Sequence, residues 1–227
     1  MLPLRDNVPT RQFPVVTVLL IAINAAVWLF YELPDLDGAV RELSFYPCDV
    51  ENTCRPPGQG WEVTWLTSMF MHANWEHILG NMLFLWIFGN NVEDAMGRVR
   101  FVAFYLLGGI AAAALQTFVT LQFGSPGDAA VPNLGASGAI SAVLGAYLIL
   151  LPGARVLTLI AFFIAEVPAF LFLGFWFLFQ LWLGGFSLVQ PEGGGGVAFF
   201  AHIGGFVFGV LAVRWFVLRR RRLLPAL

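Results

Sequence analysis

The sequence predicts an all-α, polytopic membrane protein with six transmembrane helices. Hydrophobic residues make up 59% of the 227 positions and charged residues only 11%, whereas soluble domains carry about 25% charged residues. The apolar residues are gathered in long runs separated by polar or Gly/Pro-rich stretches. Both features are typical of a chain that crosses a bilayer repeatedly.

The first apolar run, residues 14–33, begins at Pro14, a residue suited to the first turn of a helix. A signal peptide is the alternative, but the run is longer than a typical signal core and no clear cleavage site follows it. Residues 34–75 are predicted to form a long polar loop. Further helices are expected over residues 77–96, 100–122, 136–151, 156–183 and 197–217.

The chain shows no internal repeat and no second domain. We expect a short N-terminal segment (1–13), a membrane domain (14–217) and a basic tail (218–227). With the N-terminus in the cytoplasm, only Arg41 and Arg55 of the twelve basic residues fall outside, which agrees with the positive-inside rule. We therefore expect both termini in the cytoplasm, in the plasma membrane of a prokaryote. The bilayer is the expected partner; nucleic acid is not, because the arginines form no exposed stripe.

The fourth helix opens with the stretch Gly135-Ala136-Ser137-Gly138. Ser137, Ser141 and Gly145 follow one another at intervals of four residues, so they share a face suited to close helix packing. The helix is about 24 Å long at 1.5 Å per residue, against a bilayer core of about 30 Å. Its N-terminus therefore lies below the membrane surface, where it needs a water-filled pocket.

The sixth helix opens with His202, and Gly205 and Gly209 lie on the same face. Packing of this face against the small face of the fourth helix would bring His202 to Ser137. The histidine could then take the hydroxyl proton and return it to a leaving amine. No carboxylate is placed to orient the histidine, so the sequence predicts a dyad.

All three histidines of the chain, His72, His77 and His202, fall at the outer ends of helices near the serine. His77 and Asn81 point the same way on the second helix and, with the backbone N–H of Ser137, could donate to an oxyanion. A lone serine at a helix start is more often a cap or a packing residue, and glycines in a span are more often a packing motif. An ionisable residue within a span favours a functional role.

Three further residues have simpler interpretations. Glu166 could be a transporter carboxylate, but without a basic partner or an inverted repeat a structural role is favoured. Cys48 and Cys54 lack further soft ligands for a zinc site. Because their loop is predicted outside, where disulfides persist, we expect a bond between them; two free thiols are the alternative. The Phe-rich fifth helix is expected to face lipid.

These motifs together resemble the rhomboid family of intramembrane serine proteases, and the resemblance runs from about Trp61 to Gly209. The family's Gly-x-Ser-Gly matches residues 135–138. An aromatic residue often follows the family's serine by four positions, where this chain has Ser141. The family's other motifs match three further groups of residues in this chain: His72, His77 and Asn81; Glu93 and Gly97; and Ala201, His202, Gly205 and Gly209.

The resemblance implies a rhomboid-type six-helix bundle that cleaves single-span or other transmembrane proteins without metal or cofactor. It implies Ser137 as nucleophile and His202 as base, with His77 and Asn81 as oxyanion donors. The alternative is an inactive relative that binds membrane helices, and the oligomeric state stays open. The fifth helix and Gly193–Gly196 are candidates for a gate and a cap. The supporting residues are then His72, Gly135, Gly138, Gly205 and Gly209.

Overall fold

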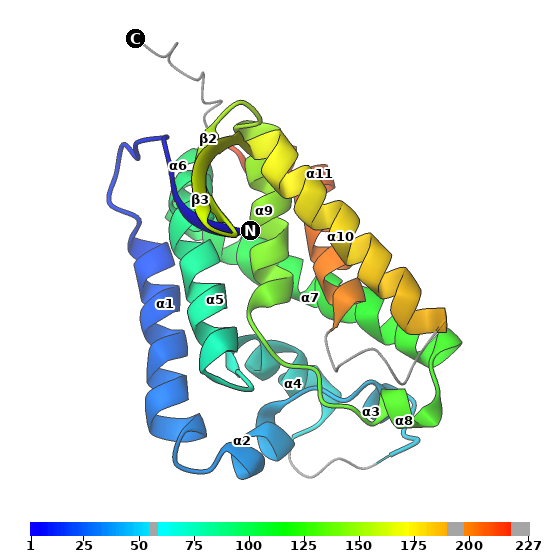
Figure 1. Ribbon diagram of the computed structural model, residues 1–227. Coiled ribbons are helices and arrows are strands. Elements are labelled where there is room, and N and C mark those ends of the chain that lie inside the picture. The colour runs from blue at the N-terminus through cyan, green and yellow to red at the C-terminus, as the bar shows by residue number, and fades with distance from the viewer. Residues whose placement is uncertain (55–58, 190–197, 219–227) are drawn as a thin grey trace.

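The computed structural model describes residues 1–54, 59–189 and 198–218 as a bundle of helices with one small sheet (Figure 1). Arg55, Gly193–Gly196 and the predicted basic tail beyond Leu218 lie outside these residues. Within the described part of the chain, four helices are long and apolar enough to cross a membrane, which makes this an integral membrane protein. They are Val15–Glu32, Arg98–Phe123, Ala169–Leu188 and Phe199–Phe216.

Two of the predicted spans are not among these four. One is a continuous helical segment made of α5, a π turn η3 and α6; the other is the shorter apolar helix α9. The helices of the bundle are α1 (Val15–Val27, continued by the π turn η1, Trp28–Glu32), α5 (Trp75–Phe84), η3 (Leu85–Gly89), α6 (Asn90–Met96), α7 (Arg98–Phe123), α9 (Ser137–Leu150), α10 (Ala169–Val189) and α11 (Phe199–Phe216).

The prediction of a loop over residues 34–75 is wrong, because short helices fill this region. The side chain of Asp35 caps the first of them by accepting from the backbone N–H of Gly38 at 3.0 Å. They gather at one end of the bundle, together with a short helix from the connection after α7 (Figure 1). These elements are α2 (Leu36–Leu43), α3 (Pro47–Val50), α4 (Trp61–Thr67), the 3₁₀ turn η2 (Ser68–Phe70) and α8 (Pro126–Ala129).

The predicted helix over residues 156–183 is also wrong in its first half, and the protein is therefore not all-α. A β-hairpin precedes α10, formed by β2 (Arg155–Ile160) and β3 (Phe163–Pro168). Pro168 explains the boundary, because a proline inside a helix removes a hydrogen bond and clashes with the preceding turn. β-Branched and aromatic residues before it favour strands.

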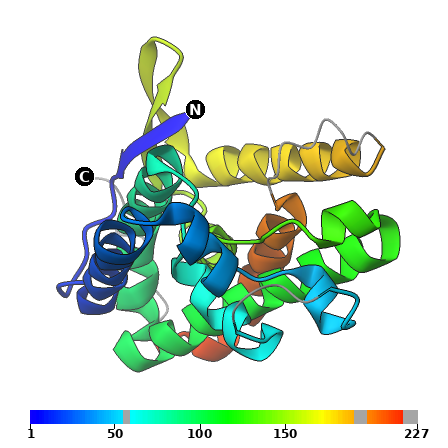
Figure 2. The same cartoon turned by 90° about the horizontal axis from the view of Figure 1, so that it is seen from below.

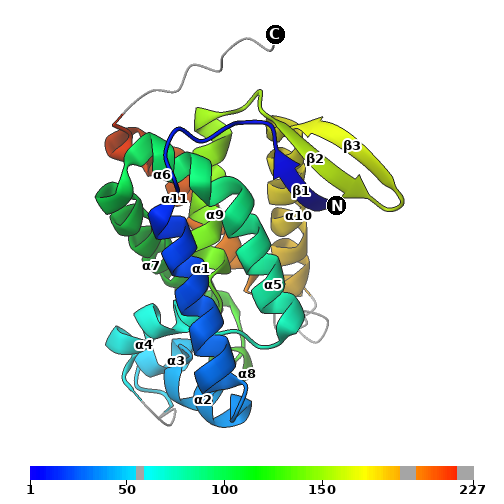
Figure 3. The same cartoon turned by 90° about the vertical axis from the view of Figure 1, so that its left-hand side faces the viewer.

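The N-terminal segment supplies a third strand, β1 (Leu2–Asp6), which pairs antiparallel with β2. The sheet has the order β1-β2-β3 and extends sideways from the end of the bundle opposite α2 and α4 (Figure 3). Asp6 ties this strand to the helices, because its Oδ2 accepts from the hydroxyl of Tyr147 at 2.5 Å and from the amide of Asn91 at 2.7 Å.

Glu93 joins α6 to the start of α1. Its buried carboxylate accepts from the backbone N–H of Val16 at 3.0 Å and from the N–H and hydroxyl of Thr17 at 2.8 Å each. The two backbone N–H groups belong to the first turn of α1, where N–H groups have no acceptor within their own helix. Four residues on, Gly97 has φ +77°, a conformation suited to glycine at the corner between α6 and α7.

Candidate active site

Ser137 and His202 lie within hydrogen-bonding distance of each other. The hydroxyl Oγ of Ser137 is 2.8 Å from Nε2 of His202, although the residues are 65 positions apart in the chain. Ser137 is the first residue of α9 and His202 lies in the first turns of α11, so both side chains come from helix N-termini. The structure thus brings together the two residues that the sequence predicts as a dyad.

Glycines allow the two helices to approach this closely. A Cβ added at Gly205 would lie 2.0 Å from the carbonyl oxygen of Gly138, and one at Gly209 would lie 2.0 Å from that of Ala142. On the facing helix, a Cβ at Gly145 would lie 2.2 Å from the carbonyl oxygen of Phe206. No real side chain fits such distances, so the contact between α9 and α11 requires backbone against backbone.

Two residues of α10 that were not predicted from the sequence contact the histidine. The Nδ1 of His202 lies 2.8 Å from Oε1 of Gln180, a buried side chain. The ring of Trp176, one helical turn earlier, lies 5.9 Å from the His202 ring at an angle of 39°. Gln180 is the one amide side chain in the apolar run 169–186, and a polar residue in a span is a signal that could have identified it.

The aromatic contact with the histidine therefore comes from α10. The position four residues after the serine, Ser141, is buried in α9, and its hydroxyl donates to the carbonyl oxygen of Ser137 at 2.6 Å. The expectation that the fifth helix simply faces lipid is incomplete, since one of its faces carries Trp176 and Gln180 to the site.

The hydroxyl–imidazole pair opens into a cavity of about 1050 Å³. Asn81 lies in its wall, and its amide Nδ2 is buried without a hydrogen-bond partner. A buried amide without a partner is costly unless a ligand or water satisfies it. The lining also includes His77, Ile140, Leu144 and Trp176.

The segment before the serine is fixed in an unusual backbone conformation. Gly135 has φ +123°, and its N–H donates to the carbonyl oxygen of Ser68 at 2.8 Å. A Cβ at this position would lie 2.7 Å from Nε2 of His77, so the imidazole of His77 lies directly against the Gly135 backbone. A side chain here would be strained and would also displace His77.

His72 lies behind the cavity. It is buried, its ring meets that of His77 edge to face at 5.1 Å, and its backbone N–H donates to the carboxylate of Glu32 at 2.5 Å. Burial, with a smaller contribution from His77, lowers the pKa of His72 to about 3. A neutral imidazole at this place supports the position of His77 without adding charge beside the cavity.

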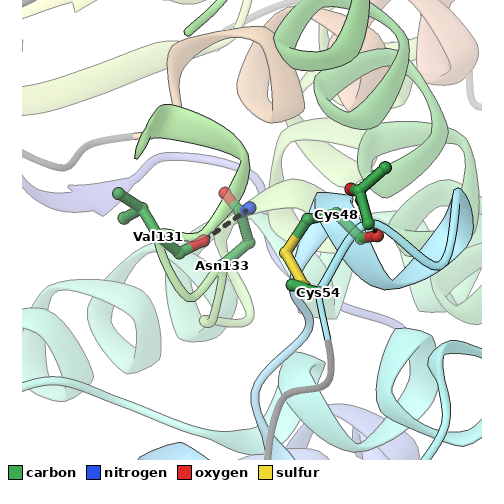
Figure 4. Close-up of a disulfide and its surroundings, with 5 residues drawn as sticks. Cys48, Cys54, Val131 and Asn133 are labelled. Carbon is green, nitrogen blue, oxygen red and sulfur yellow. Dashed lines mark hydrogen bonds between the residues drawn. A yellow bond between two sulfur atoms is a disulfide. The ribbon is translucent and has the colours of Figure 1, made fainter. Parts of the chain in front are cut away.

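The predicted bond between Cys48 and Cys54 is present in the structure (Figure 4). It closes a loop around α3, next to the strand-like segment that leads to the serine. Phe45 and Asn133 exchange two backbone hydrogen bonds, of 3.0 Å and 2.7 Å. The loop with the disulfide is therefore attached to the wall of the cavity, which Asn133 lines.

Several known proteins are similar in sequence to much of this chain. It is similar to a putative rhomboid protease, YdcA, of Bacillus subtilis, with 33% identity over 140 residues, which are 61% of this chain and 63% of that protein. It is also similar to Rhomboid protein 1, mitochondrial, of Saccharomyces cerevisiae, with 28% identity over 200 residues, covering 87% of this chain and 52% of the relative. The human presenilin-associated rhomboid-like protein, mitochondrial, is 30% identical over 137 residues, which are 60% of this chain and 33% of the relative.

The matched region spans from about a third to less than two thirds of the length of these relatives. A family model described as the Rhomboid domain matches residues 57–220, which include the serine, the histidines and the glycines described above. This match covers most of the chain, so the protein belongs to the rhomboid family.

Proposed function

We propose that this protein is an intramembrane serine endopeptidase that cleaves transmembrane segments through a Ser137–His202 dyad. The observation that carries this proposal is the 2.8 Å contact between Ser137 Oγ and His202 Nε2 at the wall of a large cavity. A hydroxyl paired with an imidazole is the pair of groups that acyl transfer needs, a nucleophile and a base.

The hydrogen bonds of the histidine favour the tautomer that the reaction requires. The Oε1 of Gln180 can only accept, so the proton of the neutral ring lies on Nδ1. Nε2 is then free to accept the proton of Ser137 Oγ as that oxygen bonds to the substrate carbonyl carbon. The same proton passes to the leaving amine when the C–N bond breaks. A water molecule then gives a proton to Nε2 and attacks the acyl carbon; the ester bond to Ser137 breaks, and the proton returns to Ser137 Oγ. Gln180 is a positioning residue in this proposal.

The developing oxyanion needs donors on the far side of the serine. The amide Nδ2 of Asn81 is buried in the cavity wall without a partner, and the first-turn N–H groups of α9 have no partners within the helix. With the neighbouring imidazole of His77 they can receive the negative charge. We assign His77 and Asn81 this role, and His72, Gly135, Gly138, Gly205 and Gly209 supporting roles.

The substrate class follows from where the site lies. A cavity among membrane-spanning helices takes a polypeptide from the bilayer, and a helix must unwind there to expose a peptide bond. We propose single-span or other transmembrane proteins as substrates. We further propose that the α5–α6 segment and α9 complete six spans, with both termini in the cytoplasm of a prokaryote and the protein in its plasma membrane. In the described residues, arginines are more numerous at the end of the bundle where β1 and β2 lie than at the end with α2 and α4, and this excess supports the proposed cytoplasmic side.

The test is proteolysis of a purified single-span substrate reconstituted in liposomes with the protein. Ser137→Ala and His202→Ala should each abolish cleavage, and the double variant should lose no more than either, because the two residues act as one unit. Ser187→Ala is the matched control. The hydroxyl of this α10 serine donates to the carbonyl oxygen of Gly184 in its own helix at 2.8 Å, so the variant should cleave the substrate at the wild-type rate.

Thermal unfolding in detergent must show that the inactive variants remain folded. Cleavage by Ser137→Ala at the wild-type rate would remove the serine from the mechanism. A wild-type protein that binds the substrate without cutting it would instead support the alternative, an inactive relative that recognises membrane helices.

A further inference from the structure

The turn of the β2–β3 hairpin exposes a group of large apolar side chains. Phe162, Phe163 and Ile164 are consecutive, and their exposed fractions are 94%, 76% and 62%. Ala161, which begins the turn, has φ +52°, so the chain reverses tightly and the three apolar side chains are held at the tip. The two strands pair without interruption, from Arg155 opposite Pro168 at the base to Ile160 opposite Phe163 at the turn.

This hairpin has no polar face. Residues 156–165 include a single polar side chain, Thr158, and its hydroxyl donates to the carbonyl oxygen of Val156 at 3.0 Å. A sheet with one face in water usually alternates apolar and polar residues, and this one does not. The charges of the hairpin lie at its base, where Arg155 and Glu166 are 3.7 Å apart and compensate each other.

The hairpin is continuous with the membrane surface of the protein. β3 ends at Pro168 and α10, a candidate span, begins at Ala169, so the sheet lies at the level where a helix leaves the bilayer. Phe170 and Leu171, in the first turn of α10, are about half exposed. The sheet extends sideways from the bundle beside this end of α10 (Figure 3). Its apolar tip is thus directed along the plane of the membrane.

We propose that the hairpin binds the bilayer surface, with its tip inserted into the leaflet at which α10 begins. Aromatic and branched side chains prefer this boundary to water, and the tip carries no charge that would oppose insertion. The depth is limited by the backbone: β3 is an edge strand, and its outward N–H and C=O groups need water or lipid headgroups. The side chains of the tip therefore enter the acyl region while the strands stay among the headgroups.

The insertion can be measured with a single spin label. Every cysteine in the described residues is in the disulfide, so Phe162→Cys provides one free thiol when the protein is labelled without reductant. The labelled protein is placed, one copy per disc, in nanodiscs of phosphatidylcholine and phosphatidylglycerol. Collision with oxygen, which concentrates in lipid, is compared with collision with a water-soluble nickel chelate. Phe175→Cys on the exposed face of α10 is the lipid reference, and Gly153→Cys in the turn before β2 is the water reference.

At position 162 we expect a ratio of oxygen to nickel accessibility close to that at position 175 and well above that at position 153. A ratio equal to the water reference would overturn the proposal. Low accessibility to both reagents would also overturn it, because the tip would then be covered by protein. Ile164→Cys gives a second reading if the first variant fails to fold. The Ser137→Ala background leaves the measurement unchanged, so its result does not depend on the proposed protease activity.

Discussion

Helices α9 and α10 both contribute to the proposed site, but they are packed in opposite ways. α9 is buried over ten consecutive residues, from Gly138 to Tyr147. α10 lies along the outside of the bundle, inclined to α9 (Figures 1 and 2). In its most apolar stretch of 18 residues, 28% of the residues are buried, against 39% in the corresponding stretches of α7 and α11. The glycines show the same contrast: a Cβ at Gly145 would strike a neighbouring backbone, whereas one at Gly174 or Gly185 would meet nothing within 4 Å.

The difference separates two requirements of the site. The proposed nucleophile, Ser137, and the proposed base, His202, are held by helices that touch backbone to backbone, so their separation is fixed by the fold. Gln180 and Trp176, which contact His202, come from a helix with few buried side chains. Changes at the α9–α11 contact should therefore damage both stability and activity, whereas changes of the α10 side chains that contact His202 should affect activity alone.

The sharpest test of this contrast exchanges glycine for leucine in both places. Gly205→Leu should abolish cleavage and lower the free energy of unfolding by about 3 kcal/mol or more, because the side chain must displace the backbone of α9. Gly174→Leu on α10 should change stability by less than about 0.5 kcal/mol and retain activity. Unfolding in detergent and substrate cleavage measure the two effects. Equal tolerance at both positions would show that the helices do not touch as described.

A second prediction concerns the amide in the cavity wall. Asn81→Ala should lower kcat about 10²-fold, the scale for loss of one oxyanion donor, with little change in KM. Asn24→Ala is the control: the amide of this buried asparagine of α1 donates to the carbonyl oxygen of Leu20 at 2.7 Å and does not line the cavity, so its loss should leave kcat unchanged. A rise in KM with kcat preserved would make Asn81 a binding residue instead.

A third prediction isolates the contribution of α10. Gln180→Leu should lower kcat about 30-fold, equivalent to about 2 kcal/mol, since the bond to the ring strengthens as the histidine becomes charged. Gln180→Glu keeps an acceptor and adds a negative charge, which stabilises the charged ring. Its pH profile should therefore keep measurable turnover, with the acidic limb moved to higher pH. A purely structural role would lower activity in both variants without moving that limb.

The smallest effect is expected at the disulfide. Replacing Cys48 and Cys54 together by alanine should lower the free energy of unfolding by about 2 kcal/mol, because the loop it closes is short. Cleavage should persist, since the backbone bonds between Phe45 and Asn133 still hold the cavity wall. Mass spectrometry after alkylation without reductant should find neither thiol labelled in the wild type; full labelling of both would contradict the bond.

The sequence predicted those parts of the site that follow from spacing along one helix. Small residues at intervals of three and four placed Ser137 opposite His202, and the structure has the two in contact. Gln180 was not found because its role depends on which face α10 turns inward, a property of tertiary packing. In an almost uniformly apolar helix, hydrophobic periodicity carries no information about orientation.

The hairpin was missed for a related reason. In residues 156–168 nearly every side chain is apolar, and a continuous apolar run does not distinguish a strand from a membrane helix by period. Pro168 and the turn at 152–153 were the available signals, and together they leave too few residues for a span. The pairing with β1 could not be read locally, because it joins segments about 150 residues apart.

Because α9 is buried, its surroundings are mainly protein and not lipid. Because protein surrounds this helix over most of its length, lipid makes little contact with the segment that carries the serine. Its 14 residues span about 21 Å, well short of a bilayer core of about 30 Å, yet the mismatch is met by neighbouring helices rather than by acyl chains. Ser137, the proposed nucleophile, is thus insulated from changes in membrane thickness, which reach it only through the surrounding helices.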